Sequence, residues 1–392
     1  MSLNLPLMDN NITREDLNEV IKFLQQDPAP ILTNSSKCRE FEAAWSNWLG
    51  VKYSVFINSG SAANSISMEI VKQKYGPGEV IVPPLTWVSD ILAVLRAGLT
   101  PRFIDVNMHN LCMNEDEIIA ALNEKTRAVF LTHVLGFNGL SDKLLNVLKE
   151  KNIPLIEDVC ESHGATFKNQ KLGSYGEQSD FSFYFAHHMS TIEGGMVCTN
   201  DEETYQMARM FRSHGMTRES TNVEIKEKYS KDFPDLRPEF IFAYPGYNFR
   251  STEINAVMGL SQLPHLDSNN VKRRENFATF LANLDKKKYF TEFTTEGSCN
   301  YAFVLLLREP DTNFCNKVMQ VLQDNKVEFR RGTAGGGNQL RQPYLIQALG
   351  KQDLEKFPVV EHIHFFGFYI GNFPSLDKER ILKLCEILNA VN

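Results

Sequence analysis

The stretch AVFLTHVLGFNGLSDKLLNVLKEKNIPLIEDV (residues 128–159) decides the fold class. The apolar runs at 128–132 and 154–157 are typical of buried strands, and the segment 142–151 between them has the spacing of an amphipathic helix. A strand, a helix and a second strand in this order predict a βαβ unit with parallel strands. The second run ends in Glu157 and Asp158, and the carboxyl ends of such strands hold the ligand sites of open α/β sheets.

The same alternation continues on both sides of this unit. Further strands are predicted at residues 53–57, 80–82, 102–105, 180–185 and 195–199. Helices are predicted at residues 37–49, 62–74, 87–97, 115–122, 201–212 and 251–263. Together these elements predict a large domain that is built on a mainly parallel sheet. Residues 216–240 are charged and have no clear period, so we expect a long functional loop over the surface there.

The last 120 or so residues predict a second, smaller domain. Strands are expected at residues 302–307, 327–329 and 366–370, and helices at 313–324 and 377–388. We place the boundary near residues 265–275. The predicted organisation is therefore a large domain over residues 1–268 and a smaller C-terminal α/β domain over residues 269–392.

The composition excludes several classes of protein. The 392 residues include 41 basic and 48 acidic side chains, so the formal charge of −7 argues against nucleic acid as a partner. The sequence shows neither a membrane-length apolar run nor a signal peptide, so we expect no membrane partner and a cytoplasmic protein. The seven cysteines are scattered without a CxxC pair, which indicates reduced thiols and no metal site.

A possible anion site follows the first strand of the large domain. The segment NSGSAAN (residues 58–64) joins this strand to a helix. Gly60 permits a tight turn, and the free N–H groups at a helix start attract anions. A tight turn with an N-cap explains the segment equally well, so its significance depends on the other motifs.

Three further segments complete a recognisable set. They are EDVCESHGA (157–165), DFSFYFAHHMSTIEGGMV (180–197) and PGYNFR (245–250). In order and spacing, the four segments resemble the sugar aminotransferases of the DegT/DnrJ/EryC1/StrS family, which are pyridoxal phosphate (PLP) proteins. The resemblance implies fold type I, the fold of aspartate aminotransferase.

One departure from the family pattern concerns the catalytic lysine. The usual pattern is Ser-Phe-x-x-x-Lys, and its lysine forms the Schiff base with PLP. Counted from Ser182, this position is His187, and no lysine occurs between Lys171 and Lys226. The chain therefore resembles the lysine-lacking subgroup, the sugar 3-dehydratases, and most of all its colitose-pathway members. The Cys-x-Cys pair of the iron–sulfur branch is missing, so an amino acid, glutamate by resemblance, would recycle the amino group.

The resemblance also assigns site residues at matching positions. It implies cofactor contacts from Gly60, Ser61, Trp87, Asp158, Glu161, Ser182 and Asn248. It implies contacts to the sugar and its diphosphate from His214, Arg218 and Arg330. Within these sets, Asp158 would pair with the protonated ring nitrogen and Trp87 would cover the ring face. Asn248 would come from a partner subunit, which implies a homodimer with shared active sites.

Histidine at position 187 suits a dehydratase. The cofactor would work as pyridoxamine phosphate (PMP), whose amine condenses with the C4 ketone of the sugar. A base must then remove a proton from C4′ of the cofactor while the 3-hydroxyl leaves. Imidazole, with an unperturbed pKa near 6.5, can do this near neutrality. The implied activity is a lyase-type removal of the 3-hydroxyl from a nucleotide-linked 4-keto-6-deoxyhexose of the GDP-4-keto-6-deoxymannose type, in deoxysugar and lipopolysaccharide biosynthesis.

Two other functions stay open at this level. The first is a PLP-dependent nucleotide-sugar aminotransferase that manages without the lysine. The second is a non-catalytic protein that binds PLP or a sugar, since fold does not fix function. The product of the reaction distinguishes these functions, because only a dehydratase removes a hydroxyl group from the sugar.

Overall fold

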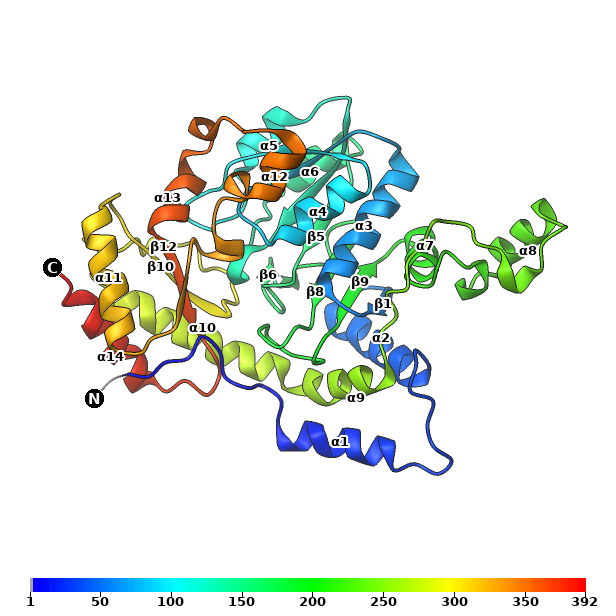
Figure 1. The fold of residues 1–392 in the computed structure, drawn as a ribbon, viewed down its shortest axis with the longest axis horizontal. Helices are drawn as coiled ribbons and strands as arrows, with labels where there is room; N and C mark the ends of the chain where they lie inside the picture. The colour runs from blue at the N-terminus through cyan, green and yellow to red at the C-terminus, as the bar shows by residue number, and fades with distance from the viewer. Residues whose placement is uncertain (1–2) are drawn as a thin grey trace.

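The computed structural model describes residues 3–392 (Figure 1). In these residues the larger sheet has seven strands in the order β1-β9-β8-β5-β4-β2-β3. Their bounds are Tyr53–Ile57 (β1), Glu79–Val82 (β2), Thr100–Phe103 (β3), Thr126–Thr132 (β4), Leu155–Asp158 (β5), Gln178–Ser182 (β8) and Gly195–Thr199 (β9). The strands from β3 to β8 are parallel, and β9 is antiparallel to both of its neighbours. The predicted mainly parallel sheet is confirmed.

Helices cover both faces of this sheet because the buried strands present apolar side chains on both sides. In β4, Val129 and Leu131 belong to one core cluster, whereas Ala128 and Phe130 belong to another. The first cluster includes residues of α2 (Ser36–Leu49), α5 (Glu115–Ala121), α6 (Asp142–Glu150) and α9 (Glu253–Gln262). On the other face lie α3 (Gly60–Tyr75), α4 (Val88–Arg96) and α7 (Glu202–Arg212).

The C-terminal part forms a second α/β layer at the left of Figure 1. Its antiparallel sheet has the order β10-β12-β11, with the bounds Ala302–Leu306 (β10), Phe329–Arg331 (β11) and Gly367–Gly371 (β12). The helices of this part of the chain are α11 (Thr312–Asp324), α12 (Pro343–Leu349), α13 (Pro358–Phe366) and α14 (Lys378–Asn389). Of these, α12 and α13 were not among the helices that the sequence predicts. Leu345 of α12 belongs to a core cluster of the large sheet. The division at 268/269 falls inside α10 (Leu266–Asn283) and stays a prediction.

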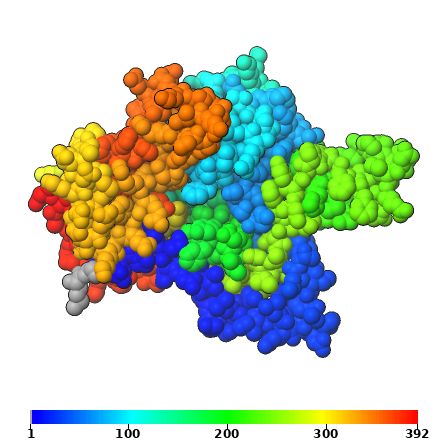
Figure 2. Space-filling model, in the orientation of Figure 1, coloured from blue at the N-terminus to red at the C-terminus, as the bar shows by residue number. Residues whose placement is uncertain are grey.

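The N-terminal segment reaches the C-terminal layer before the chain enters the large sheet. Leu5 forms a parallel bridge with Val327 and belongs to the core cluster of the C-terminal layer. The chain then continues to α1 (Arg14–Leu24), which starts with a capping box between Thr13 and Asp16. This path takes residues 7–13 past the loop that follows β8, as Figure 2 shows in dark blue beside green.

Residues 216–240 correct a sequence prediction. They were expected to form a loop, but they contain α8 (Val223–Asp232), which starts at the N-cap residue Asn222. No residue of α8 is buried, so the helix has no apolar face for the sequence to display. Residues 213–245, which we call the arm, project from the body at the right of Figure 1. None of the helices in residues 3–392 has both the length and the apolar character needed to cross a bilayer.

Candidate active site

The start of α3 and the end of β8 form a cradle for an anion. Ser59 caps α3, and its hydroxyl accepts a hydrogen bond from the Ala62 N–H at 3.1 Å. In residues 3–392 the N–H groups of Gly60 and Ser61 have no acceptor within the chain. A Cβ on Gly60 would lie 2.5 Å from Cβ of Ser182, so only glycine lets α3 approach β8 this closely. The predicted phosphate-binding residues Gly60, Ser61 and Ser182 therefore come together.

Asp158 ends β5 beside this cradle. Its side chain is 3% exposed and accepts hydrogen bonds from the Cys160 N–H (2.8 Å) and the Asn64 amide (3.1 Å). Within the described chain no lysine, arginine or histidine forms an ion pair with it. Burial raises the pKa of Asp158 to about 6. A buried carboxylate without a cation is unusual, and it fits a positively charged ligand group.

Two more buried carboxylates stand behind Asp158. The Asn64 amide also donates to Asp90 at 2.7 Å, and Asp90 accepts a second bond from the Thr132 hydroxyl at 2.7 Å. Asp180, whose neighbour in the β-ladder is Asp158, accepts a bond from the Ser67 hydroxyl. Burial raises the pKa of both Asp90 and Asp180 well above the usual range, so both favour the neutral form. Burial thus disfavours the charged form of all three carboxyl groups.

His187 lies in the loop after β8 and is partly buried. Its ring centroid lies 5.8 Å from that of Tyr301 and 6.2 Å from that of His163, and its Nδ1 is buried without a hydrogen-bond partner. Burial, and then the positive charge of Arg273, lowers the pKa of His187 to about 4. The imidazole is therefore neutral at pH 7 and can accept a proton.

His188 points elsewhere, as the divergence of adjacent side chains predicts. Its Nε2 lies 2.8 Å from the Cys299 carbonyl oxygen, and its ring stacks on His163 at 5.3 Å. The described part of the chain holds no cluster of three His, Cys, Asp or Glu side chains suited to a metal ion.

Glu161 and Tyr301 connect His187 to the C-terminal layer. The Glu161 carboxylate accepts a hydrogen bond from the Leu135 N–H at 2.9 Å, and the Tyr301 hydroxyl donates to it at 3.5 Å. Burial raises the pKa of Glu161 to about 7. Asn64, Asp90 and Tyr301 were missed from the sequence. Asn64 stands inside the motif 58–64, whereas Asp90 and Tyr301 belong to none of the four motifs.

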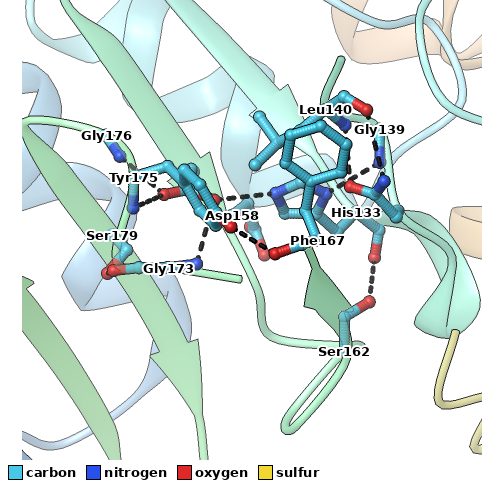
Figure 3. Close-up of polar contacts among 12 residues, drawn as sticks. His133, Gly139, Leu140, Asp158, Ser162, Phe167, Gly173, Tyr175, Gly176 and Ser179 are labelled. Atoms are coloured by element: carbon cyan, nitrogen blue, oxygen red, sulfur yellow. Dashed lines mark hydrogen bonds and ion pairs between the residues drawn. The ribbon is translucent and has the colours of Figure 1, made fainter. Parts of the chain in front are cut away.

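A separate network holds the other face of β5 (Figure 3). The Glu157 carboxylate accepts hydrogen bonds from the N–H groups of Gly173, Tyr175 and Gly176 and lies 3.1 Å from Nε2 of His133. Nδ1 of His133 accepts from the Gly139 N–H, so Nε2 carries the proton that is donated to Glu157. The His133 N–H also donates to the Asp158 carbonyl oxygen at 2.9 Å. The Glu157 network therefore fixes the strand end that carries Asp158.

The remaining predicted residues lie on exposed surfaces. Trp87 directly precedes α4 and is 57% exposed. His214 and Asn248 lie in adjoining segments, because Ser213 forms a bridge with Asn248 and the His214 N–H donates to the Tyr247 carbonyl. Arg218 and Arg330 are also exposed, Arg218 in the arm and Arg330 on β11. Within residues 3–392, none of His214, Arg218, Asn248 and Arg330 hydrogen-bonds to Asp158 or His187.

The comparisons with known proteins agree with this geometry. A model of the DegT/DnrJ/EryC1/StrS aminotransferase family matches residues 10–389. The chain belongs to this family. GDP-4-keto-6-deoxy-D-mannose 3-dehydratase of Yersinia pseudotuberculosis, a relative, is 29% identical over 392 residues, which cover 98% of each chain. The family predicted from the four motifs is therefore confirmed.

Two solved structures show the same fold as this DegT/DnrJ/EryC1/StrS family member. One is GDP-4-keto-6-deoxymannose-3-dehydratase with a trapped PLP-glutamate geminal diamine, with a TM-score of 0.88 and 26% identity. The other is a variant of that enzyme with a histidine replaced by asparagine and GDP-perosamine bound, also with a TM-score of 0.88 and 26% identity. Each match covers 98% of this chain and 100% of the other. The predicted fold of PLP-dependent enzymes is thus confirmed.

Proposed function

We propose that this protein is a PLP/PMP-dependent 3-dehydratase of nucleotide-linked 4-keto-6-deoxyhexoses. It removes the 3-hydroxyl of a substrate of the GDP-4-keto-6-deoxymannose type and takes its amino group from glutamate. The names of the relatives support this substrate and this donor, since they include a 3-dehydratase, a PLP-glutamate adduct and bound GDP-perosamine. The observation that carries the proposal is the neutral, unpartnered imidazole of His187 at the lysine position of the family.

The residues around Asp158 fit the cofactor. The N–H groups at the start of α3, with Ser182, suit a phosphate, and Asp158 lacks a cation that a protonated pyridine nitrogen would supply. Trp87, one residue before α4, would cover the ring. When bound, PMP supplies the amine that condenses with the C4 ketone and a ring that accepts the electrons of the C4′–H bond.

His187 performs the proton transfers in this proposal. Its neutral imidazole takes the proton from C4′ of the cofactor and returns a proton when the donor is converted. The ring of Tyr301 packs edge-on against it and limits its rotation. Glu161, whose raised pKa favours the protonated form, can donate a hydrogen bond toward the leaving 3-hydroxyl. Without a lysine here, the chain cannot hold the cofactor covalently, which favours elimination over ordinary amine transfer.

We also propose that two copies of the chain share their active sites. His214, Arg218 and Asn248 are exposed on or beside the arm, and none of them hydrogen-bonds to the Asp158 of its own chain. In a homodimer Asn248 would contact the partner's cofactor phosphate. His214 and Arg218 would contact the sugar and its diphosphate, and Arg330 on β11 would contact them too. The arm exposes large apolar side chains that a partner would cover, namely Val223, Phe233, Leu236, Phe240 and Phe242. The seven free cysteines suit the cytoplasm, where we place the reaction.

The test is the mass of the product. The purified protein is incubated with PLP, glutamate and the GDP-linked 4-keto-6-deoxyhexose, and in parallel with its CDP and dTDP counterparts. The proposal predicts a product that lacks one oxygen, with 2-oxoglutarate and ammonia released. A product with the keto oxygen replaced by an amine would instead show an aminotransferase. A bound but unchanged sugar would show a binding protein.

A further inference from the structure

A cavity of about 210 Å³ is lined by His187 and by none of the phosphate-cradle residues Gly60, Ser61 and Ser182. It lies between the N-terminal segment 7–13, the loop that carries His187 and the turn 372–375 after β12. Most of the residues that line this cavity are uncharged. The charged side chains that line it are Arg273 of α10 and Asp9 of the N-terminal segment.

Arg273 carries a buried charge without a counter-ion. The residue is 5% exposed, and its Nη1 donates to the backbone carbonyl oxygens of Asn372 and Tyr301. Its Nε is buried without an acceptor, and within residues 3–392 no carboxylate lies within ion-pair distance. Asp9 is exposed and accepts hydrogen bonds from Asn10 and Ser375 instead. A buried guanidinium in this state is costly unless an anion arrives to pair with it.

We propose that Arg273 binds a carboxylate group of the amino donor in the cavity beside His187. This inference rests on the proposed function and adds the donor site to it. A guanidinium matches a carboxylate with two parallel hydrogen bonds, and the unpartnered Nε is one of the donors that such a pair uses. His187 and Arg273 both line this cavity, so a carboxylate that is bound by Arg273 lies in the same space as the imidazole. A dicarboxylic amino acid such as glutamate is the ligand class.

The same contact connects donor binding to the basicity of His187. The positive charge of Arg273 lowers the pKa of His187, and it also lowers the pKa of His163 and His188, the other two rings of this cluster. A bound carboxylate offsets that charge, so the pKa of His187 rises when the donor is present. His187 then becomes a stronger base when there is a proton to take from the donor. The other titratable groups here are Tyr301, whose raised pKa keeps it neutral, and Glu161, whose pKa is raised by burial to about 7.

The test separates the donor half-reaction from the sugar half-reaction. The variants are Arg273→Gln and Arg273→Lys, with Lys272→Gln as the control, because Lys272 is the exposed neighbour on α10. Glutarate, which has two carboxylates but no amine, serves as an unreactive probe of the PLP-loaded protein. We expect the Kd of glutarate and the KM of glutamate to rise about 100-fold in Arg273→Gln. The Arg273→Lys variant should recover part of this loss, and Lys272→Gln should match the wild type.

The sugar half-reaction provides the internal control. With PMP supplied, Arg273→Gln should still convert one equivalent of sugar, with a rate that changes far less than the donor half-reaction does, since no amino donor is needed and only the basicity of His187 is altered. Equal losses in both half-reactions would mean that Arg273 only supports the fold, and unchanged glutarate binding would exclude the carboxylate site. If wild-type protein with PMP leaves the sugar unchanged while Arg273→Gln still loses glutarate binding, the proposed function fails and the donor site stands.

Discussion

Two acids that are adjacent in β5 have opposite surroundings. Glu157 accepts three backbone N–H bonds and the proton of His133, so every donor and acceptor in the Glu157 network is matched. Asp158 faces the other way, with two hydrogen bonds and no cation. The two histidines differ in the same way, because both ring nitrogens of His133 are bonded and Nδ1 of His187 is not. Matched polar groups hold the fold, and the unmatched ones are left for a ligand.

The largest effect is expected from a substitution of His187, which should change the activity and not the stability. In a His187→Asn variant we expect turnover to fall about 10²- to 10⁴-fold, because a general base is lost. The melting temperature should stay within error of the wild type, since the ring nitrogen that is removed makes no hydrogen bond. Steady-state assays and thermal unfolding measure the two quantities. A large loss of melting temperature would place His187 with His133 as a structural residue.

The Glu157 network should show the reverse pattern. A Glu157→Gln change puts an NH2 group in place of one carboxylate oxygen, so two of the four buried donors that face Glu157 lose their acceptor. The free energy of unfolding should therefore fall by about 3–5 kcal/mol. The Kd of PLP should change less than threefold once the folded fraction is corrected for, because Glu157 faces away from the cradle. Denaturant unfolding and a cofactor titration test this. A variant that keeps its full stability but loses PLP affinity would show that Glu157 serves the cofactor and not the fold.

Asp158 should make the cofactor-free protein pH-sensitive. Its pKa is raised from 3.8 to about 6 in the fold, so between pH 4 and 6 the native state holds the proton more tightly than the unfolded chain does. Stability is therefore lost as the pH rises through this window, by about 3 kcal/mol in total. The loss should be smaller in Asp158→Asn, where only the other buried acids contribute, and smaller with PLP bound. Unfolding curves across this range measure it, and equal slopes for both proteins would contradict it.

The smallest effect is expected for Tyr301→Phe. The hydroxyl donates to Glu161 over 3.5 Å, a weak bond whose loss should cost less than about 1 kcal/mol of stability. Because this bond lowers the pKa of Glu161, its removal should move the acidic group of the pH–rate profile to higher pH. The ring contact with His187 stays in place. An unchanged pH–rate profile would show that Glu161 is not the group whose protonation limits the rate.

The sequence predicts the frame of the molecule better than its site. β1 and β9 were predicted with the bounds that the structure shows, because their ends coincide with polar or glycine residues. The four motifs identified the family because each is short and contiguous. The helix α8 was missed since it buries nothing and therefore has no apolar period. The strand before the His187 loop was predicted over residues 180–185, but β8 ends at Ser182, so the loop starts three residues earlier than predicted. The partners of its histidine could not be predicted from the motif.

The site residues that the sequence did not predict are defined by contacts between segments that are distant in the chain. Asp90 meets Asp158 only because Asn64 of α3 bonds to both. Tyr301 reaches His187 from the C-terminal layer, and Arg273 shares a cavity with it from α10. Residue type alone cannot show that a charge is buried without a partner. The roles of the predicted site residues, and the division into residues 1–268 and 269–392, stay predictions for experiment.

The most direct test of the account compares wild type with His187→Lys. Each protein is given PLP, glutamate and the GDP-linked keto sugar, and both the sugar product and the borohydride-reduced protein are weighed by mass spectrometry. We predict that the wild type releases a sugar without its 3-hydroxyl and holds no covalent cofactor. The lysine variant should trap PLP covalently and move the product toward an amino sugar. A lysine variant that binds no PLP covalently and still removes the hydroxyl at the wild-type rate would contradict the central role of His187.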